Sequence, residues 1–193
     1  MPMNKPRLLG ISGSLRSGSY NTAILNTLAE AVADRATMAT FQLDEVPLYN
    51  ADLDTQTPPP AVAALRREIA EADGIVIAVP EYNHGVSGVL KNALDWASRP
   101  FGRSTLTGKP ILTLTSSPAF TGGVRAQAQL NETLTSIGAI LILRPQTVIA
   151  SVHEKIKDGR LVDAQTTTFL LAGVADLLRD IDRTAHIVAL EQA

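Results

Sequence analysis

Two polar segments of the sequence carry residue types that suit ligand binding, and the first of them suits a phosphate. Ser12-Gly13-Ser14-Leu15-Arg16-Ser17-Gly18-Ser19-Tyr20-Asn21-Thr22 follows an apolar run and leads into a helical pattern. Its hydroxyls, its glycines, the guanidinium of Arg16 and the free amides at the start of the next helix suit a phosphate dianion. An ordinary capped turn explains the Ser and Asn residues but leaves Arg16 unexplained. We therefore interpret the segment as a phosphate loop.

The second segment follows the apolar run Ile75-Val76-Ile77-Ala78-Val79, which is typical of a strand buried on both faces. Pro80 ends the strand because it has no N–H to donate to a neighbour. Tyr82-Asn83-His84-Gly85 then lies at the carboxyl end of a central strand, where open α/β sheets bind ligands. The backbone amides of this turn suit the edge of a flat heterocycle.

The elements that position these segments alternate between strand and helix along the chain. We expect strands at residues 7–12, 38–43, 74–79, 110–115 and 139–143, and helices at 21–34, 61–72, from near Ser87, 124–137 and 167–183. Arg144-Pro145 interrupts the fifth strand, which Val148-Ile149 is able to resume. The pattern predicts one domain over residues 1–193, with a five-stranded parallel sheet in the flavodoxin-like order 2-1-3-4-5 and helices on both faces.

Composition narrows the function classes. The chain has 193 residues, 45% of them hydrophobic and 19% charged, which is globular composition. A net charge of −2 without a basic cluster argues against nucleic acid or acidic membranes as partners. The N-terminal residues lack a signal peptide and no apolar run approaches the ~20 residues that span a bilayer, so we expect a cytoplasmic protein. The chain has no cysteine, so any redox chemistry requires a bound cofactor.

Four other kinds of site are not supported by the spacing. Gly10, Gly13 and Gly18 do not form a dinucleotide fingerprint, and Gly102 to Lys109 does not form a Walker loop. The run Gly10 to Ser14 lacks the last glycine of a nucleophile elbow. We expect no metal, because Asp52 and Asp54 have no nearby histidine or third acid and are interpreted as solvated loop residues.

One phosphate loop and one heterocycle turn suit a mononucleotide, and the chain resembles the NADPH-dependent FMN reductase family, which includes quinone and chromate reductases. The resemblance covers three regions in the family's order: Gly13 to Asn21; Pro80-Glu81-Tyr82-Asn83 with Leu90-Lys91-Asn92-Ala93-Leu94-Asp95-Trp96; and Ser116-Ser117-Pro118 with Gly122-Gly123. One departure is Ser87, where family members commonly carry Pro. Serine also starts helices well, as a cap.

The resemblance implies roles for individual residues. It places Ser14, Arg16, Ser19 and Asn21 around the FMN phosphate, with Thr22 at the helix start, and Pro80, Glu81, Tyr82, Asn83 and Gly85 around the isoalloxazine ring, with Ser116 and Ser117 on its other side. No catalytic side chain is implied, because hydride transfer between nicotinamide and flavin is the chemistry of the cofactors. Glu81 is either a solvated loop acid or a residue near the nicotinamide, and Arg125 is either a surface charge or a ligand of NADPH phosphate or a neighbouring subunit. We expect Trp96 to pack in the core.

The resemblance therefore implies an FMN-dependent enzyme that uses NADPH or NADH to reduce flavin, quinone or a similar small-molecule electron acceptor by a two-electron ping-pong scheme. It also implies a homodimer or homotetramer, and we assign the loop from Asp44 to Pro60 to a site or subunit interface because of its length. Two alternatives remain. One is a flavodoxin-type electron carrier without NAD(P)H activity, against which Arg16 argues. The other is a flavin-free binding module.

Overall fold

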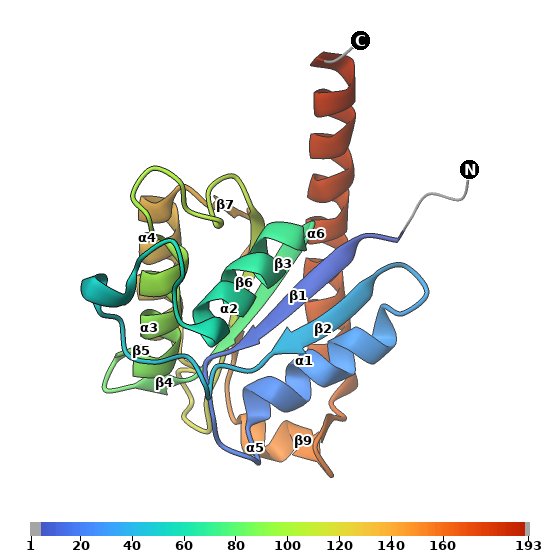
Figure 1. Ribbon diagram of the computed structural model, residues 1–193. Coiled ribbons are helices and arrows are strands. Elements are labelled where there is room, and N and C mark those ends of the chain that lie inside the picture. Colours follow the sequence, from blue (N-terminus) through green and yellow to red (C-terminus); the bar gives the residue numbers. More distant parts are fainter. Residues whose placement is uncertain (1–4, 192–193) are drawn as a thin grey trace.

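A parallel sheet forms the centre of the computed structural model, which describes residues 5–191 (Figure 1). In spatial order its strands are β2 (Thr37–Phe41), β1 (Arg7–Ser12), β3 (Gly74–Val79), β6 (Pro110–Ser116) and β7 (Ile140–Leu141), and each neighbouring pair is parallel. This is the predicted flavodoxin-like order. The bounds of β1 and β3 agree with the prediction at both ends.

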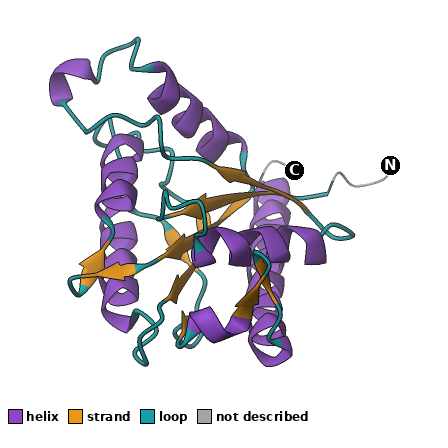
Figure 2. Ribbon diagram, turned by 90° about the horizontal axis from the view of Figure 1, so that it is seen from below, coloured by secondary structure: helices purple, strands orange, loops and turns teal. Residues whose placement is uncertain are grey.

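Helices cover both faces of the sheet (Figure 2). On one face lie α1 (Tyr20–Ala31) and α6 (Ala164–Glu191), and on the other lie α2 (Pro60–Glu71), α3 (Gly88–Ala97) and α4 (Val124–Ile137). The alternation of side chains along a strand explains this arrangement. Ile75, Ile77 and Val79 of β3 pack with α2, α3 and α4, whereas Val76 and Ala78 pack with α1 and α6. All five side chains are buried, which explains why the sequence of β3 is a continuous apolar run.

The fifth strand differs from the expected continuous segment at 139–143. It consists of β7 and a separate piece, β8 (Val148–Ile149), which pair with opposite ends of β6. Arg144 lies between the two pieces and turns toward α6, where its guanidinium contacts the Asp176 carboxylate at 3.1 Å and covers the Phe169 ring at 4.9 Å. These contacts, together with the missing N–H of Pro145, interrupt the pairing.

Helix α6 is longer than the predicted 167–183, and its last turns extend beyond the rest of the fold (Figure 1). It starts earlier because Asp163 caps it, accepting a hydrogen bond from the Thr166 amide at 2.9 Å. Hydrogen bonds from the Thr166 hydroxyl and amide and from Lys155 hold the pKa of Asp163 below its ordinary value. No glycine or proline follows Thr184 to end the helix earlier. Within the described chain, no helix is both long enough and apolar enough to cross a membrane.

The loop from Asp44 to Pro60 is held on α3 by side chains of that helix. Asn92 accepts a hydrogen bond from the Tyr49 amide at 2.7 Å and donates one to the Pro47 carbonyl at 2.8 Å. The Trp96 indole donates to the same carbonyl, also at 2.8 Å, and the side chain of Trp96 is fully buried, so its predicted packing role is confirmed. The long loop therefore has a structural anchor within its own chain.

Asp54, which we expected to be solvated, instead pairs with Arg66 at 2.8 Å, and its side chain is only 12% exposed. The Arg66 guanidinium also donates to the Trp96 carbonyl, so the pair joins the loop to α2 and α3. Charge pairing across the loop satisfies the carboxylate, and the sequence pattern gave no sign of it. Within residues 5–191, no group of three or more His, Asp or Glu side chains is placed to hold a metal ion.

Several short elements lie outside the predicted pattern. They are the 3-10 turn η1 (Ala51–Leu53), the hairpin β4 (Glu81–Tyr82) and β5 (Gly85–Val86), the helix α5 (Val152–Lys155), and the hairpin β9 (Ile156–Lys157) and β10 (Arg160–Leu161). The β4–β5 hairpin matters most, because it lies within the segment predicted to bind a heterocycle. Each element is too short to leave a periodic signal in the sequence.

Candidate functional site

A cavity of about 290 Å³ lies where the phosphate loop and the β4–β5 hairpin meet, beyond the carboxyl ends of β1, β3 and β6. We call it the cradle. It is lined by Ser14, Arg16, Ser19, Tyr20, Asn21, Pro80, Glu81, Tyr82, Ser116, Ser117 and Pro118. Carboxyl ends of parallel strands are the usual ligand-binding edge of an open α/β sheet. Its volume is near the lower end of the ~300–1,000 Å³ typical of ligand pockets, which suits a ligand that stays partly exposed.

The phosphate-loop side of the cradle ends at the start of α1. The Ser19 hydroxyl caps this helix by accepting from the Thr22 amide at 3.2 Å. Within residues 5–191, the amides of Tyr20 and Asn21 have no backbone acceptor, as is usual in a first helical turn. The exposed Arg16 guanidinium stacks over the Tyr20 ring at 4.8 Å, beside these amides. Free N–H groups, a helix dipole and a cation therefore converge on one point.

The floor of the cradle is made of buried polar side chains. Asn21 and Ser116 are each only 3% exposed, and the Ser116 hydroxyl donates to the Asn21 Oδ1 at 3.0 Å. Thr22 lies behind this floor and donates from its hydroxyl to Ser12 Oγ at 2.9 Å. These bonds orient the side chains before any ligand binds.

The other side of the cradle is the β4–β5 hairpin. Asn83 and His84 form its turn, with φ of 50° and 66°, the left-handed pair that two-residue hairpins require. Tyr82 is 57% exposed and lines the cavity, so an aromatic face lies at its mouth. Gly85 does not have a left-handed φ, and a side chain added there would meet Gln129 Oε1 at 2.9 Å.

Glu81 turns its side chain away from solvent, so the solvated-acid alternative is wrong. Its carboxylate accepts hydrogen bonds from the Arg125 and Ala126 amides at 2.9 and 3.1 Å, and the side chain is 10% exposed. It therefore caps the start of α4. The Arg125 guanidinium lies 3.8 Å from the same carboxylate. Gly123, just before α4, has φ of 91°, and a Cβ there would lie 3.0 Å from Thr115 Cβ.

Ser87 joins the two halves of the cradle. The expected side-chain cap of α3 by Ser87 is not made. Its hydroxyl instead donates to the Gly13 carbonyl at 2.6 Å in a buried position. Gly13 is tightly enclosed, since a Cβ there would lie 2.8 Å from Val79 Cγ2. A proline at position 87 has no hydroxyl and could not make this bond.

We expect Ser87→Ala to lower the free energy of unfolding by about 1–3 kcal/mol, because it leaves the buried Gly13 carbonyl without a donor. Urea denaturation measures the change. Ser136→Ala, at an exposed serine of α4, is the control and should stay within about 0.5 kcal/mol of the wild type. A Ser87→Ala protein as stable as the control would show that the bond contributes nothing.

The structure brings most of the predicted ligand residues to one cavity. Thr22, Asn83 and Gly85 are the exceptions, since none of them lines the cradle. Two lining residues were not predicted, Tyr20 and Pro118. Their positions in the sequence could have identified them. Tyr20 directly follows the helix cap, and Pro118 ends the Ser-Ser-Pro run after the fourth strand.

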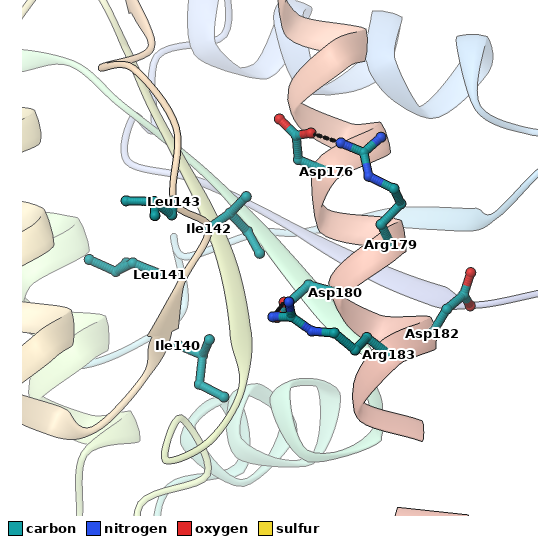
Figure 3. A pocket seen from close by; sticks show the side chains of 9 residues that line it. All are labelled: Ile140, Leu141, Ile142, Leu143, Asp176, Arg179, Asp180, Asp182 and Arg183. Carbon is teal, nitrogen blue, oxygen red and sulfur yellow. Dashed lines mark hydrogen bonds and ion pairs between the residues drawn. The ribbon is translucent and has the colours of Figure 1, made fainter. Parts of the chain in front are cut away.

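A larger cavity of about 620 Å³ lies elsewhere, between β7 and the later turns of α6 (Figure 3). Its lining combines the side chains of 140–143 with charged residues of α6, among which Arg179 pairs with Asp176 and Arg183 with Asp180 (Figure 3). Ile140 pairs with Pro110 at the amino end of β6, so this cavity opens at the opposite edge of the sheet from the cradle. Both arginines of this cavity are already paired with aspartates of the same helix, so among the described residues the cavity offers no free cation for a phosphate.

The fold and the cradle define a flavodoxin-like protein with a ligand cavity at the carboxyl ends of its central strands. The profile of the NADPH-dependent FMN reductase family matches residues 6–154, and the chain belongs to this family. The predicted family and fold, and the expectation of an oxidoreductase, are confirmed.

The names of individual relatives are consistent with this family. An NAD(P)H-dependent FMN reductase of Pseudomonas aeruginosa is 41% identical over 158 residues, covering 81% of this chain and 85% of that protein. A quinone reductase of Escherichia coli K12 is 38% identical over 170 residues, covering 86% and 90%. The solved structure of the flavoenzyme NAD(P)H:(acceptor) oxidoreductase FerB from Paracoccus denitrificans has a TM-score of 0.84 at 30% identity and covers 92% of this chain and 98% of its own.

Proposed function

We propose that this protein is an FMN-dependent NAD(P)H oxidoreductase that reduces quinones or similar small acceptors. The observation that carries the proposal is the pair of helix N-termini at the edge of the sheet. The start of α1 is open to the cradle beside Arg16, whereas the start of α4 is occupied by the Glu81 carboxylate. Of these two helix starts only that of α1 is free to hold a phosphate at the cradle, and one phosphate position there suits FMN better than a dinucleotide.

In this assignment the chain binds and orients the cofactor. Arg16, Ser14, Ser19 and the first amides of α1 would hold the phosphate, and the backbone of Pro80 to Tyr82 would bind the ring. Thr22, Asn83 and Gly85 would support these segments from behind. Ser116 and Ser117 would face the ring from β6. Bound FMN supplies the ring that accepts the hydride, and the reaction requires no side chain as acid or base.

The two substrates would use the same side of the cradle in turn. The floor at Asn21 and Ser116 is buried, whereas Tyr82 and Pro118 are exposed at the mouth. A nicotinamide and a quinone are both planar, so each can stack on the flavin ring at this open side. The buried floor excludes water from the opposite face of the ring. A single shared side would impose a ping-pong scheme, because the oxidised nicotinamide must leave before the quinone can bind.

We further propose a homodimer or homotetramer in the cytoplasm, with residues 1–193 as one domain. The support is the family membership together with two exposed apolar side chains, Phe120 at 89%, two residues after Pro118 of the cradle, and Leu48 at 83%, in the loop from Asp44 to Pro60. A partner subunit that covered either side chain would remove its apolar surface from water. The electron donor is NADPH or NADH.

The proposed function is tested by anaerobic mixing of FMN-loaded protein with excess NADPH or NADH. We expect either nicotinamide to bleach the flavin absorbance without a partner protein, and benzoquinone added afterwards to restore it. Dithionite serves as the control, because it reduces any accessible flavin. A protein that dithionite bleaches while both nicotinamides leave it yellow for minutes would instead be an electron carrier of the flavodoxin type.

A further inference from the structure

The β4–β5 hairpin is fastened to α4 at two points. Glu81 of β4 accepts the two hydrogen bonds from the Arg125 and Ala126 amides, and Gln129, one helical turn further along α4, accepts one from the Val86 amide at 2.7 Å. Glu81 is nearly buried, whereas Gln129 is exposed. The Glu81 bonds are therefore the better shielded of the two attachments.

The Glu81 attachment is also the stronger one for electrostatic reasons. A carboxylate that accepts backbone amides makes charge-assisted hydrogen bonds, and its negative charge lies at the positive end of the α4 dipole. Gly123 starts the helix beside Glu81 with a left-handed φ of 91°, and a Cβ added there would crowd the Thr115 Cβ at 3.0 Å and lie 3.5 Å from the Glu81 Cβ. The hairpin cannot move relative to α4 without breaking these bonds.

Glu81 also lies at the cradle, next to Pro80 and Tyr82 in the lining. Its carboxylate is committed to α4, so what it offers the ligand is a fixed backbone. The same commitment removes the α4 amides as a rival site for a phosphate. Both effects act on how the cofactor lies in the cradle, and neither requires the carboxylate to touch it.

We infer that Glu81 is a positioning residue for the flavin ring: by capping α4 it fixes the ring-binding turn. This inference rests on the proposed binding of FMN. The site then has two parts with different duties: Glu81 fixes the segment that binds the ring, and Arg16 binds the phosphate.

The test compares FMN with riboflavin, which has the same ring but no phosphate. Glu81→Ala removes the acceptor and the charge, and Glu81→Gln keeps an acceptor oxygen at the same place. Glu132→Ala, an exposed acid on the same helix, is the matched control. Affinities are measured by quenching of flavin fluorescence, and the midpoint potential of bound flavin by spectroelectrochemical titration.

We expect Glu81→Ala to weaken FMN and riboflavin by the same factor, about 10- to 100-fold, and to shift the midpoint potential of the bound flavin. Glu81→Gln should recover part of both effects, and Glu132→Ala should match the wild type. A variant that merely loses stability would lower the melting temperature of the ligand-free protein while leaving the midpoint potential unchanged.

Wild-type affinities and an unchanged potential in Glu81→Ala would overturn the inference. If that variant does not fold, Glu81→Gln decides, because a potential and affinities equal to the wild type with a lowered melting temperature would assign Glu81 to stability alone. Loss of FMN binding with riboflavin binding retained would also contradict it. A wild-type protein that binds neither flavin would refute the proposed function itself, which is a separate result.

Discussion

Arg16→Ala is expected to weaken FMN binding by about 10- to 150-fold while leaving riboflavin binding unchanged. The estimate corresponds to about 1.5–3 kcal/mol for a hydrogen bond to a charged group. Arg16 lies at the cradle beside the open start of α1, and its stacking on Tyr20 holds the guanidinium there. A cation in that place acts on a phosphate and has no counterpart on the uncharged ring.

Salt provides a second readout for Arg16. Because this side chain is exposed, its attraction for a phosphate is screened by ions, so wild-type FMN affinity should fall with ionic strength more steeply than that of Arg16→Ala. Arg35→Ala is the control, since Arg35 is exposed beyond the opposite end of α1. FMN affinity equal to that of the control, measured by flavin fluorescence, would remove Arg16 from the phosphate site.

Trp96→Ala is expected to lower the free energy of unfolding by about 3–5 kcal/mol, the usual range for removing a buried aromatic side chain. The Trp96 side chain is fully buried, donates to Pro47, and meets the Tyr49 ring edge-on with 4.9 Å between centroids. Its loss leaves a cavity and also removes one of the hydrogen bonds that anchor the loop from Asp44 to Pro60. Urea denaturation of the ligand-free protein measures the change.

Two further variants separate packing from hydrogen bonding at Trp96. Trp96→Phe keeps part of the aromatic packing and removes the indole donor, while Asn92 still donates to the Pro47 carbonyl, so it should cost less, about 1–3 kcal/mol. Phe101→Ala is the control, because Phe101 is 91% exposed and its loss should change stability by less than about 0.5 kcal/mol. A Trp96→Ala protein within 1 kcal/mol of that control would show that neighbouring side chains close the cavity.

The sequence by itself determined the layered fold and the edge at which the site lies. The apolar runs of β1 and β3 are buried on both faces. The local pattern of apolar residues therefore predicts both strands at their observed bounds. The flanking polar segments at Ser14 and Pro80 follow these strands directly. Parallel strands bring their carboxyl ends to one edge, and this is why the sequence predicts one cavity from segments that are far apart along the chain.

Only the tertiary structure decided which side chains are committed within the protein. Ser87 bonds to Gly13, which is 74 residues away, and Glu81 bonds to Arg125, which is 44 residues away. Asp54 is paired with Arg66 instead of being solvated, and the fifth strand is divided at Arg144 by contacts with α6. Periodicity reports which face of an element is buried, because burial repeats along the chain with the backbone. A single polar contact between distant segments has no such repeat, and it exists only once packing has brought its two partners together.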